Sequence, residues 1–307
     1  MIISASRRTD IPAFYTRWLL ARLREGFVYV RNPFRYHQIS RVSLDPEMVD
    51  CIVFWTKNPA PLLPHLQTLE DMGYSYYFQF TLTPYEQRIE KNLPSKAVLV
   101  RTFQKLAERV GPKRIVWRYD PIILTPELSI AQHVRLFAQL AEALRGICER
   151  CVISFLDLYT KTKRNTKDLG LLPITEQDMQ LLGRELSAVA HMFNLQLSTC
   201  AEEVDLSQWG ITHGKCIDGD LIERITGRPL KPKKDRNQRA NCGCVESVDI
   251  GAYDTCLHQC LYCYANANHR SAQKRWAEHD PASPLLVGCV TQDDTVFVRG
   301  GPAVRQL

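Results

Sequence analysis

Three cysteines near the C-terminal end of the chain have a spacing that suits an iron–sulfur cluster. They are Cys256, Cys260 and Cys263, in the segment CLHQCLYC. Thiolates ligate iron–sulfur clusters, usually four to a cluster, and spacings of two to four residues let one loop wrap around a cubane. Three cysteines leave one iron of a [4Fe–4S] cluster without a ligand from this loop. Because an open metal position is where a small molecule can bind and react, the triad predicts chemistry rather than a purely structural site.

The segment from Tyr253 to Asn266, YDTCLHQCLYCYAN, resembles the cluster loop of the radical S-adenosylmethionine (SAM) superfamily, CxxxCxΦC, with Tyr262 at the aromatic position Φ. The resemblance implies a [4Fe–4S] cluster whose fourth iron is chelated by SAM, and reductive cleavage of SAM to a 5′-deoxyadenosyl radical. It also implies that Tyr262 lies on the adenine side of SAM and that a reduced flavodoxin or ferredoxin donates the electron. The whole chain resembles an uncharacterised bacterial family, domain of unknown function 1848, with a cysteine region similar to that of the spore photoproduct lyases.

The sequence departs from the superfamily pattern in two places. The cluster loop lies near the end of the chain rather than after the first strand. A Gly-Gly-Glu segment usually contacts the SAM amino group, but here Gly300-Gly301 is followed by Pro302. The position at which SAM is held is therefore open. A zinc site with only cysteine ligands is the alternative interpretation of the triad.

Four further cysteines lie in the same part of the chain, and they are enough for a second metal centre. An auxiliary [4Fe–4S] cluster, a structural zinc ion and unligated buried thiols are all compatible with their spacing. The remaining four are expected to be structural, because Cys148 and Cys151 border an apolar strand. The possible second ligand set is Cys200, Cys216, Cys242 and Cys244, and the structural set is Cys51, Cys148, Cys151 and Cys289.

Polar residues at the ends of predicted strands are the candidates for holding SAM or substrate. Lys57 and Arg118 could pair with the SAM carboxylate through charge-assisted hydrogen bonds, although ordinary salt bridges are equally compatible with them. Asp120 and Asp157 could bind ribose hydroxyls or substrate. His258, between two cluster cysteines, is either a hydrogen-bonding neighbour of the cluster or simply exposed. Other residues that could line the same site are Arg7, Arg8, Asp10, Glu202 and Glu203.

The elements that must position these residues alternate between strand and helix. Such alternation predicts βαβ units and a mainly parallel sheet, either a barrel or an open doubly wound sheet. Polar residues at the carboxyl ends of strands favour the barrel, and so does the superfamily resemblance. We therefore expect an α/β fold with a partial or complete (β/α) TIM-like barrel. The strands expected are Ile2–Ser6, Cys51–Trp55, Tyr76–Phe80, Arg114–Arg118, Cys151–Phe155 and Leu195–Ser198.

We expect the barrel to occupy residues 1–199 and a cysteine-rich region, residues 200–307, to pack over its mouth. In that second region the sequence predicts a helix over Ala265–Glu278 and a strand pair, Leu285–Val287 with Val296–Val298. Helices are expected between the barrel strands, and Thr175 with Asp178 forms a capping box for the last of them. Those helices are 10–26, 61–72, 95–110, 129–144 and 175–193.

The composition is that of a globular protein: 307 residues, 45% hydrophobic and 23% charged. No apolar run approaches the roughly 20 residues that span a bilayer, and the N-terminus does not resemble a secretory signal, so a cytoplasmic enzyme without membrane contact is expected. Ten of the eleven cysteines lie from Cys148 onward, which in an intracellular chain favours metal over disulfides.

The net charge of +6 owes much to the basic loop Lys231–Arg239. This loop is either solvated or contacts phosphates. It supports a second hypothesis, a zinc-stabilised nucleic-acid-binding or scaffold protein. The sequence does not identify the substrate of the radical SAM enzyme, and a nucleic acid is one candidate.

Overall fold

The computed structural model describes residues 1–239, 241–299 and 303–304. The chain divides into two compact units, and each draws on segments that are distant in sequence. The sequence-based division at residue 199 is a different partition, since both units contain residues from both sides of it. The first unit comprises Met1–Tyr76, Ser247–Gln259 and Ala265–Leu307, and the second comprises Tyr77–Glu246 and Cys260–Tyr264.

The first unit contains three parallel strands in the order β10-β1-β4. Strand β1 (Ile2–Ala5) is buried along its whole length, and β4 (Cys51–Thr56) is a nearly continuous apolar run, as expected of strands covered on both faces. The third strand, β10 (Val248–Asp249), was not predicted because it is only two residues long. The helices of this unit are α1 (Ile11–Phe14), α2 (Thr16–Glu25), α3 (Leu66–Asp71) and α9 (His269–Ala277), with a 3-10 turn η1 (Leu63–His65).

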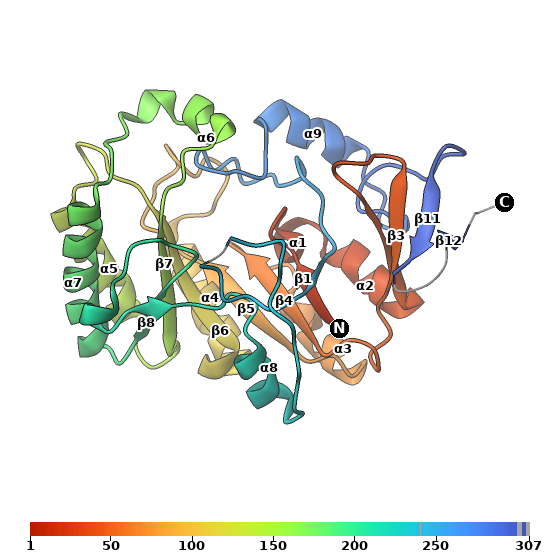
Figure 1. The fold of residues 1–307 in the computed structure, drawn as a ribbon, viewed down its shortest axis with the longest axis horizontal. Helices are drawn as coiled ribbons and strands as arrows, with labels where there is room; N and C mark the ends of the chain where they lie inside the picture. The colour runs from red at the N-terminus through yellow and green to blue at the C-terminus, as the bar shows by residue number, and fades with distance from the viewer. Residues whose placement is uncertain (240, 300–302, 305–307) are drawn as a thin grey trace. The chain divides into compact units, whose positions relative to one another are not determined.

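A second sheet of the first unit has the order β12-β11-β3-β2. Strands β2 (Phe27–Arg31) and β3 (Gln38–Ser43) form an antiparallel pair, and β11 (Thr295–Val298) lies parallel to β3, as Figure 1 shows. The short β12 (Ala303–Val304) pairs with β11. The prediction that β11 pairs with Leu285–Val287 is wrong, because β11 pairs with a strand from the N-terminal part of the chain. Within the tail, Leu285 forms an isolated bridge with Tyr29.

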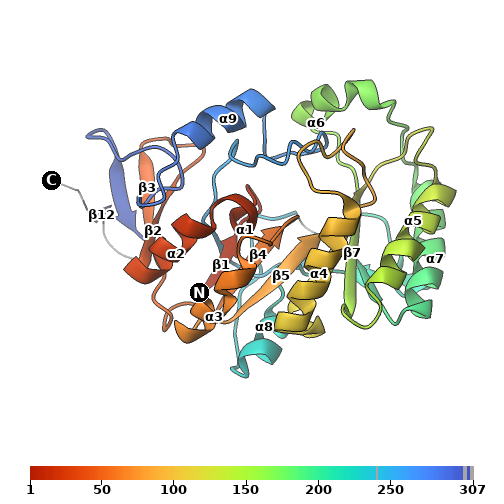
Figure 2. The same cartoon turned by 180° about the vertical axis from the view of Figure 1, so that it is seen from behind.

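The second unit contains five parallel strands in the order β5-β6-β7-β8-β9. Helices α5 and α7 pack side by side, which Figures 1 and 2 show from opposite directions. The predicted capping box of α7 is confirmed, since Thr175 and Asp178 bond reciprocally. The strands are β5 (Tyr76–Thr81), β6 (Ile115–Ile122), β7 (Arg150–Phe155), β8 (Gln196–Thr199) and β9 (Thr212–His213). The helices are α4 (Lys96–Val110), α5 (Ile130–Ala143), α6 (Thr160–Asn165), α7 (Glu176–Met192) and α8 (Gly219–Thr226), with 3-10 turns η2 (Pro112–Arg114), η3 (Lys167–Leu169) and η4 (Ser207–Trp209).

The two faces of the β5 and β6 strands differ in character. On one face Phe80 contacts Phe103 of α4, and Trp117 stacks on Phe137 of α5 with ring centroids 4.9 Å apart. Because side chains alternate along a strand, Gln79 and Arg118 point to the opposite face. One face of these strands thus packs against helices through apolar side chains. The other face carries buried polar side chains.

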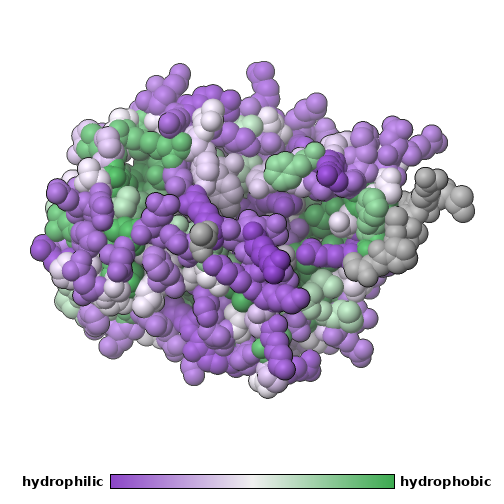
Figure 3. Space-filling model, viewed as in Figure 1, coloured by the Kyte–Doolittle hydropathy of each residue, from purple (hydrophilic) through white to green (hydrophobic). Residues whose placement is uncertain are grey.

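The fold is therefore a mixed α/β fold of parallel strands and helices, as predicted, while the closed or partial barrel stays a prediction. Hydrophilic residues cover most of the surface seen in Figure 3. No helix in the described part of the chain is both long and apolar enough to cross a membrane.

Candidate functional site

Four cysteines of the second unit lie near one another. Cys200 follows β8, and its Sγ lies 3.2 Å from the Sγ of Cys216, which is in the turn between β9 and α8. Cys244 lies beside Cys216, because its Sγ accepts a hydrogen bond from the Ile217 amide at 3.4 Å, and Cys242 is two residues before Cys244. The cysteines that the sequence singled out as a second ligand set are therefore brought together by the fold. We call this set the four-thiol cluster.

Two glycines allow the three segments that carry these thiols to approach closely. A Cβ atom on Gly214 would lie 2.7 Å from the Ser198 Oγ and 2.8 Å from the Thr199 carbonyl oxygen, next to Cys200. A Cβ on Gly243 would lie 2.9 Å from Cγ of Lys215, next to Cys216. Only glycine fits such approaches without displacement. The segment around Gly214 thus packs against the residues just before Cys200, and the segment around Gly243 packs against those just before Cys216.

The buried guanidinium of Arg118 forms one side of the cluster. It donates from Nη1 to the Sγ of Cys216 at 2.9 Å and to the Gln79 Oε1 at 3.3 Å. Its Nε donates to Asp120 at 3.0 Å, and its Nη2 also donates to that carboxylate. Burial by itself lowers the pKa of Arg118. The negative charges of Asp120, Cys216 and Cys200 raise the pKa by more than burial lowers it, so the net shift is upward. Arg118 and Asp120, predicted as ligands of SAM or substrate, are engaged with the four-thiol cluster.

The thiols of the cluster differ in acidity. The side-chain hydrogen bond from Cys244 lowers the pKa of Cys242 to about 7. The hydrogen bond with Cys216, together with burial, raises the pKa of Cys200. For Cys216, the bond with Cys200 lowers the pKa, but the bond with Cys244 and burial raise it more. By contrast, burial raises the pKa of Cys148 to about 11, which fits its predicted structural role.

The basic loop Lys231–Arg239 is hydrogen-bonded to the segment that holds two of the thiols. The amide of Asp235 donates to the Cys244 carbonyl at 3.0 Å, and the amide of Cys242 donates to the Arg239 carbonyl at 3.0 Å. Arg239 also pairs with the predicted site residue Asp157. The loop surrounds a hollow of about 440 Å³, lined by Lys233, Lys234, Asp235, Arg236, Gln238 and Arg239.

Of the two predicted glutamates, Glu202 has a defined partner. Its Oε1 accepts a hydrogen bond from the Phe155 amide at 2.9 Å, and burial raises its pKa to about 7. Glu203 is exposed. The Glu202 side chain therefore lies at the carboxyl end of β7, whereas Glu203 is a surface residue.

The cysteine triad lies in a loop without regular secondary structure. Cys256 belongs to the first unit, and Cys260 and Cys263 belong to the second. All three thiol-bearing residues are partly exposed, whereas Cys51, Cys148 and Cys151 are buried. Cys289, predicted to be structural, is exposed. Within the second unit, the Cys263 amide donates to the Cys260 carbonyl at 3.1 Å, and the Leu261 amide donates to the Ile89 carbonyl at 3.0 Å, which fixes this end of the loop.

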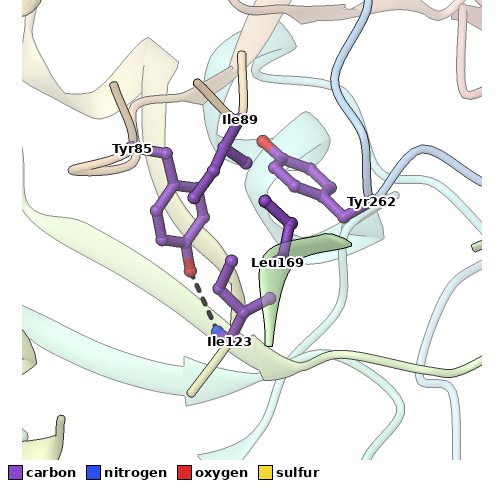
Figure 4. Close-up of a cluster of buried hydrophobic side chains, with 5 residues drawn as sticks. All are labelled: Tyr85, Ile89, Ile123, Leu169 and Tyr262. Carbon is purple, nitrogen blue, oxygen red and sulfur yellow. Dashed lines mark hydrogen bonds between the residues drawn. The ribbon is translucent and has the colours of Figure 1, made fainter. Parts of the chain in front are cut away.

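Tyr262, predicted to lie near the adenine of SAM, anchors the loop in the second unit. Its ring packs in an apolar cluster with Tyr85, Ile89, Ile123 and Leu169, as Figure 4 shows. Its hydroxyl donates to the buried carboxylate of Glu90. Burial and the Glu90 charge raise the pKa of Tyr262 well above its usual value, so the hydroxyl stays protonated as a donor. The role of Tyr262 toward adenine stays a prediction.

In the first unit, His258 holds the other part of the loop. Its Nε2 lies 2.7 Å from the Asp10 Oδ2, and both side chains are about 5% exposed or less. The same Asp10 oxygen accepts from the backbone amide of Lys57 at 2.7 Å. The alternative that His258 is simply exposed is wrong. Asp10, which was predicted to cap the first helix and to line the site, also positions both His258 and the end of β4.

Two buried polar atoms of this loop have no partner among the described residues. They are His258 Nδ1 and the Oδ1 of Asn266, whose Nδ2 donates to the Cys256 carbonyl at 2.6 Å. Buried polar atoms are nearly always hydrogen-bonded, so each of these two calls for a group that the polypeptide does not supply.

The described residues contain no group of three or more His, Cys, Asp or Glu side chains already arranged to hold a metal ion. Gly300, Gly301 and Pro302, which stand where a SAM-binding segment was sought, lie outside the described residues.

Sequence comparison gives one family assignment. The family model for a domain of unknown function, DUF1848, matches residues 2–265, which include both sets of cysteines. The chain belongs to the DUF1848 family. No curated protein matches this DUF1848 chain.

Among solved structures, this DUF1848 chain is similar to a Bacteroides thetaiotaomicron protein provisionally named an α-L-fucosidase. The two share 12% identity over 76% of this chain and 85% of the other, with a TM-score of 0.26. A likeness at that score carries no argument about fold or activity.

Proposed function

We propose that this DUF1848 protein is a radical SAM enzyme whose Cys256, Cys260 and Cys263 ligate a [4Fe–4S] cluster. The observation that carries the proposal is the CxxxCxYC loop itself, with three partly exposed thiols held on an irregular backbone. The three loop cysteines are partly exposed, unlike the buried Cys51, Cys148 and Cys151, and this exposure supports a role as ligands. SAM is the proposed ligand of the remaining iron.

The residues around the loop suit such a group. Three thiols give the donor set of a cluster with one open iron. Residues that hydrogen-bond around a metal site orient its ligands and tune its potential. In this chain the buried Nδ1 of His258, which is midway in sequence between Cys256 and Cys260, is available for that role, because Nε2 is engaged by Asp10. The side-chain Nδ2 of Asn266 donates to the Cys256 carbonyl and so holds the backbone at that cysteine.

When bound and reduced by a flavodoxin or ferredoxin, the cluster would supply the electron that cleaves SAM to methionine and a 5′-deoxyadenosyl radical. The polypeptide would bind, orient and shield these groups. Asp10 fixes the imidazole of His258 and, through the Lys57 amide, the end of β4. Glu90 fixes Tyr262 between the last two cysteines. Lys57 stays the proposed partner of the SAM carboxylate, because Arg118 already serves Asp120, Gln79 and Cys216.

The test is anaerobic purification followed by iron and sulfide analysis and incubation with SAM and a strong reductant. We expect about four irons and four sulfides per chain, and formation of 5′-deoxyadenosine with methionine. Cys263→Ser should abolish both the iron and the SAM cleavage. Cys289→Ser, at an exposed position outside the loop, is the matched control and should change neither. A reconstituted wild-type protein that never cleaves SAM would refute the proposal.

The other sequence-based hypothesis, a zinc-stabilised nucleic-acid-binding or scaffold protein, stays a prediction. It requires the basic loop to contact phosphates, and binding of that kind weakens steeply with salt. Nucleic acid as a substrate of the radical enzyme and a cytoplasmic location likewise stay predictions.

A further inference from the structure

We propose that the four-thiol cluster, Cys200, Cys216, Cys242 and Cys244, binds a single zinc ion. This site is separate from the triad loop and does not depend on the radical SAM proposal. The sequence left three possibilities open for these cysteines: an auxiliary iron–sulfur cluster, zinc, or no ligand. The packing of the second unit distinguishes among them.

The closeness of the thiols favours one shared ion over a cubane. In a tetrahedral zinc site with Zn–S bonds of about 2.3 Å, neighbouring sulfurs lie about 3.8 Å apart. The Cys200 and Cys216 sulfurs are 3.2 Å apart, and the Cys244 sulfur lies 3.4 Å from the amide of Ile217, the residue after Cys216. A cubane binds its thiolates on different iron atoms, which places them farther apart than ligands of one ion. Zinc binding would release the thiol protons and draw the four sulfurs around one centre.

The burial of the cluster argues against unligated thiols. Cys216, Cys242 and Cys244 are 6% exposed or less. Buried small thiols are common, but they usually lie among apolar side chains. Here the Cys216 sulfur accepts from the buried guanidinium of Arg118, which also pairs with Asp120 and Gln79, so the site is polar as well as buried.

Charge balance and backbone geometry also fit zinc. Four cysteines that bind Zn²⁺ lose up to four protons, which leaves a net charge of −2 on the site. Arg118 donates to the Cys216 sulfur and so offsets part of that charge. The Ile217 amide donates to the Cys244 sulfur at 3.4 Å, a contact that also stabilises a thiolate. Both donors point to cysteine sulfurs, and thiolate sulfur is a ligand that suits zinc.

The close glycine contacts give the site its framework. Gly214 and Gly243 bring the segments ending in Cys200, Cys216 and Cys244 against one another before any metal binds. The basic loop is bonded to the same segment through Asp235 and Arg239. Zinc would therefore fix both the thiol segment and the loop beside it.

The experiment is metal analysis of the full-length protein and of three multiple variants. We expect about one zinc per chain in the wild type and none in Cys242→Ser/Cys244→Ser. The triad variant Cys256→Ser/Cys260→Ser/Cys263→Ser should lose iron and SAM cleavage but keep its zinc, which separates this proposal from the previous one. The matched control Cys148→Ser/Cys151→Ser should keep both metals.

A footprint on the wild type keeps the test valid if the double variant does not fold. Mass spectrometry after alkylation should show these four cysteines protected before chelation and labelled after it, with no change at Cys51. Replacement of zinc by cobalt should give the intense thiolate-to-cobalt charge-transfer absorption of a four-sulfur site. A wild type without zinc, a loss of iron from the double variant, or a Cys200–Cys216 disulfide in the native protein would each overturn the proposal.

Discussion

Asp10 shows how one buried carboxylate organises several parts of the first unit. Its Oδ1 caps α1 through the Ala13 amide at 2.9 Å, and its Oδ2 serves Lys57 and His258. Removal of one partner of a buried charged group leaves the others unpaired. We expect Asp10→Ala to lower the free energy of unfolding by about 3 kcal/mol, measured by denaturant titration.

The control for this change is Asp293→Ala, at an exposed position of the same unit. Exposed substitutions usually change stability by less than about 0.5 kcal/mol. Equal losses in the two variants would show that the Asp10 contacts contribute nothing specific.

At Gly214 a backbone atom of a neighbouring segment limits the room for a side chain. An added Cβ would meet the Thr199 carbonyl oxygen at 2.8 Å, and a backbone atom cannot turn aside as a side chain can. We expect Gly214→Ala to lower the stability of the second unit by about 2 kcal/mol and to weaken zinc binding. Gly243→Ala should cost less, because its nearest contact is the flexible side chain of Lys215. Thermal unfolding of the two variants, with metal content, decides this ranking, and the reverse order would contradict it.

The candidate ligands could be identified from sequence, but their surroundings could not. Cysteine spacing predicted both sets of thiols, because metal ligation depends on residue type and short separations. The contacts of Gln79, Glu90 and Gly214 depend on segments far apart in the chain, and nothing in their local sequence marks them. Arg118 was predicted as a SAM contact from its place at a strand end, but β6 continues to Ile122, so Arg118 lies within the strand, where it contacts Asp120, Gln79 and Cys216.

At the scale of elements, strand β11 is fastened beside the β2–β3 hairpin by an ion pair. Arg31 at the end of β2 donates to both oxygens of Asp294, at 2.6 and 2.9 Å, and the Asp294 side chain is fully shielded from solvent. The hydrogen bonds from Arg31 lower the pKa of Asp294. We expect Asp294→Asn to destabilise the protein by about 2 kcal/mol at neutral pH.

The same pair predicts a dependence on pH. Since the pKa of Asp294 is lower in the folded than in the unfolded state, its stabilisation is complete above the unfolded value of about 3.9 and is lost as the pH falls below it. The stability difference between wild type and Asp294→Asn should therefore be constant from pH 7 to about pH 5 and shrink below about pH 4. Unfolding titrations across that range provide the measurement, and a difference that grows on acidification would contradict this sign.

Long periodic elements could be predicted from the sequence, and short ones could not. The strands Cys51–Thr56 and Tyr76–Thr81 and the helix Lys96–Val110 match their predicted positions closely. Strand β3 was missed because polar residues interrupt its pattern. Strands β9 and β10 are too short to show any periodicity. Helix α9 begins at His269 rather than at Ala265, since Asn268 caps it through the Ser271 amide.

At the scale of the whole molecule, the division into two compact units makes the effect of zinc removal specific. All four ligands of the proposed zinc site belong to the second unit. We expect chelation to speed amide hydrogen exchange around Cys200, Cys216 and Cys244, while β1, β4 and α2 keep their protection. Exchange followed by mass spectrometry of peptides gives this comparison, and uniform loss of protection would show that the units do not respond separately.

The pairing of β1 with β10 and of β3 with β11 bears on how the chain is completed during synthesis. A ribosome that has released residues 1–76 has produced strands whose partners, Val248–Asp249 and Thr295–Val298, do not yet exist. Nearly all of the second unit, by contrast, is continuous in sequence and emerges before those partners. Domains of a nascent chain fold as units when their residues are available. The sheets formed by residues 1–76 therefore cannot be completed until residues 248–298 have been synthesised. Until then the unpaired edges of β1 and β3 are exposed, and they are the part of the nascent chain that a chaperone would have to cover.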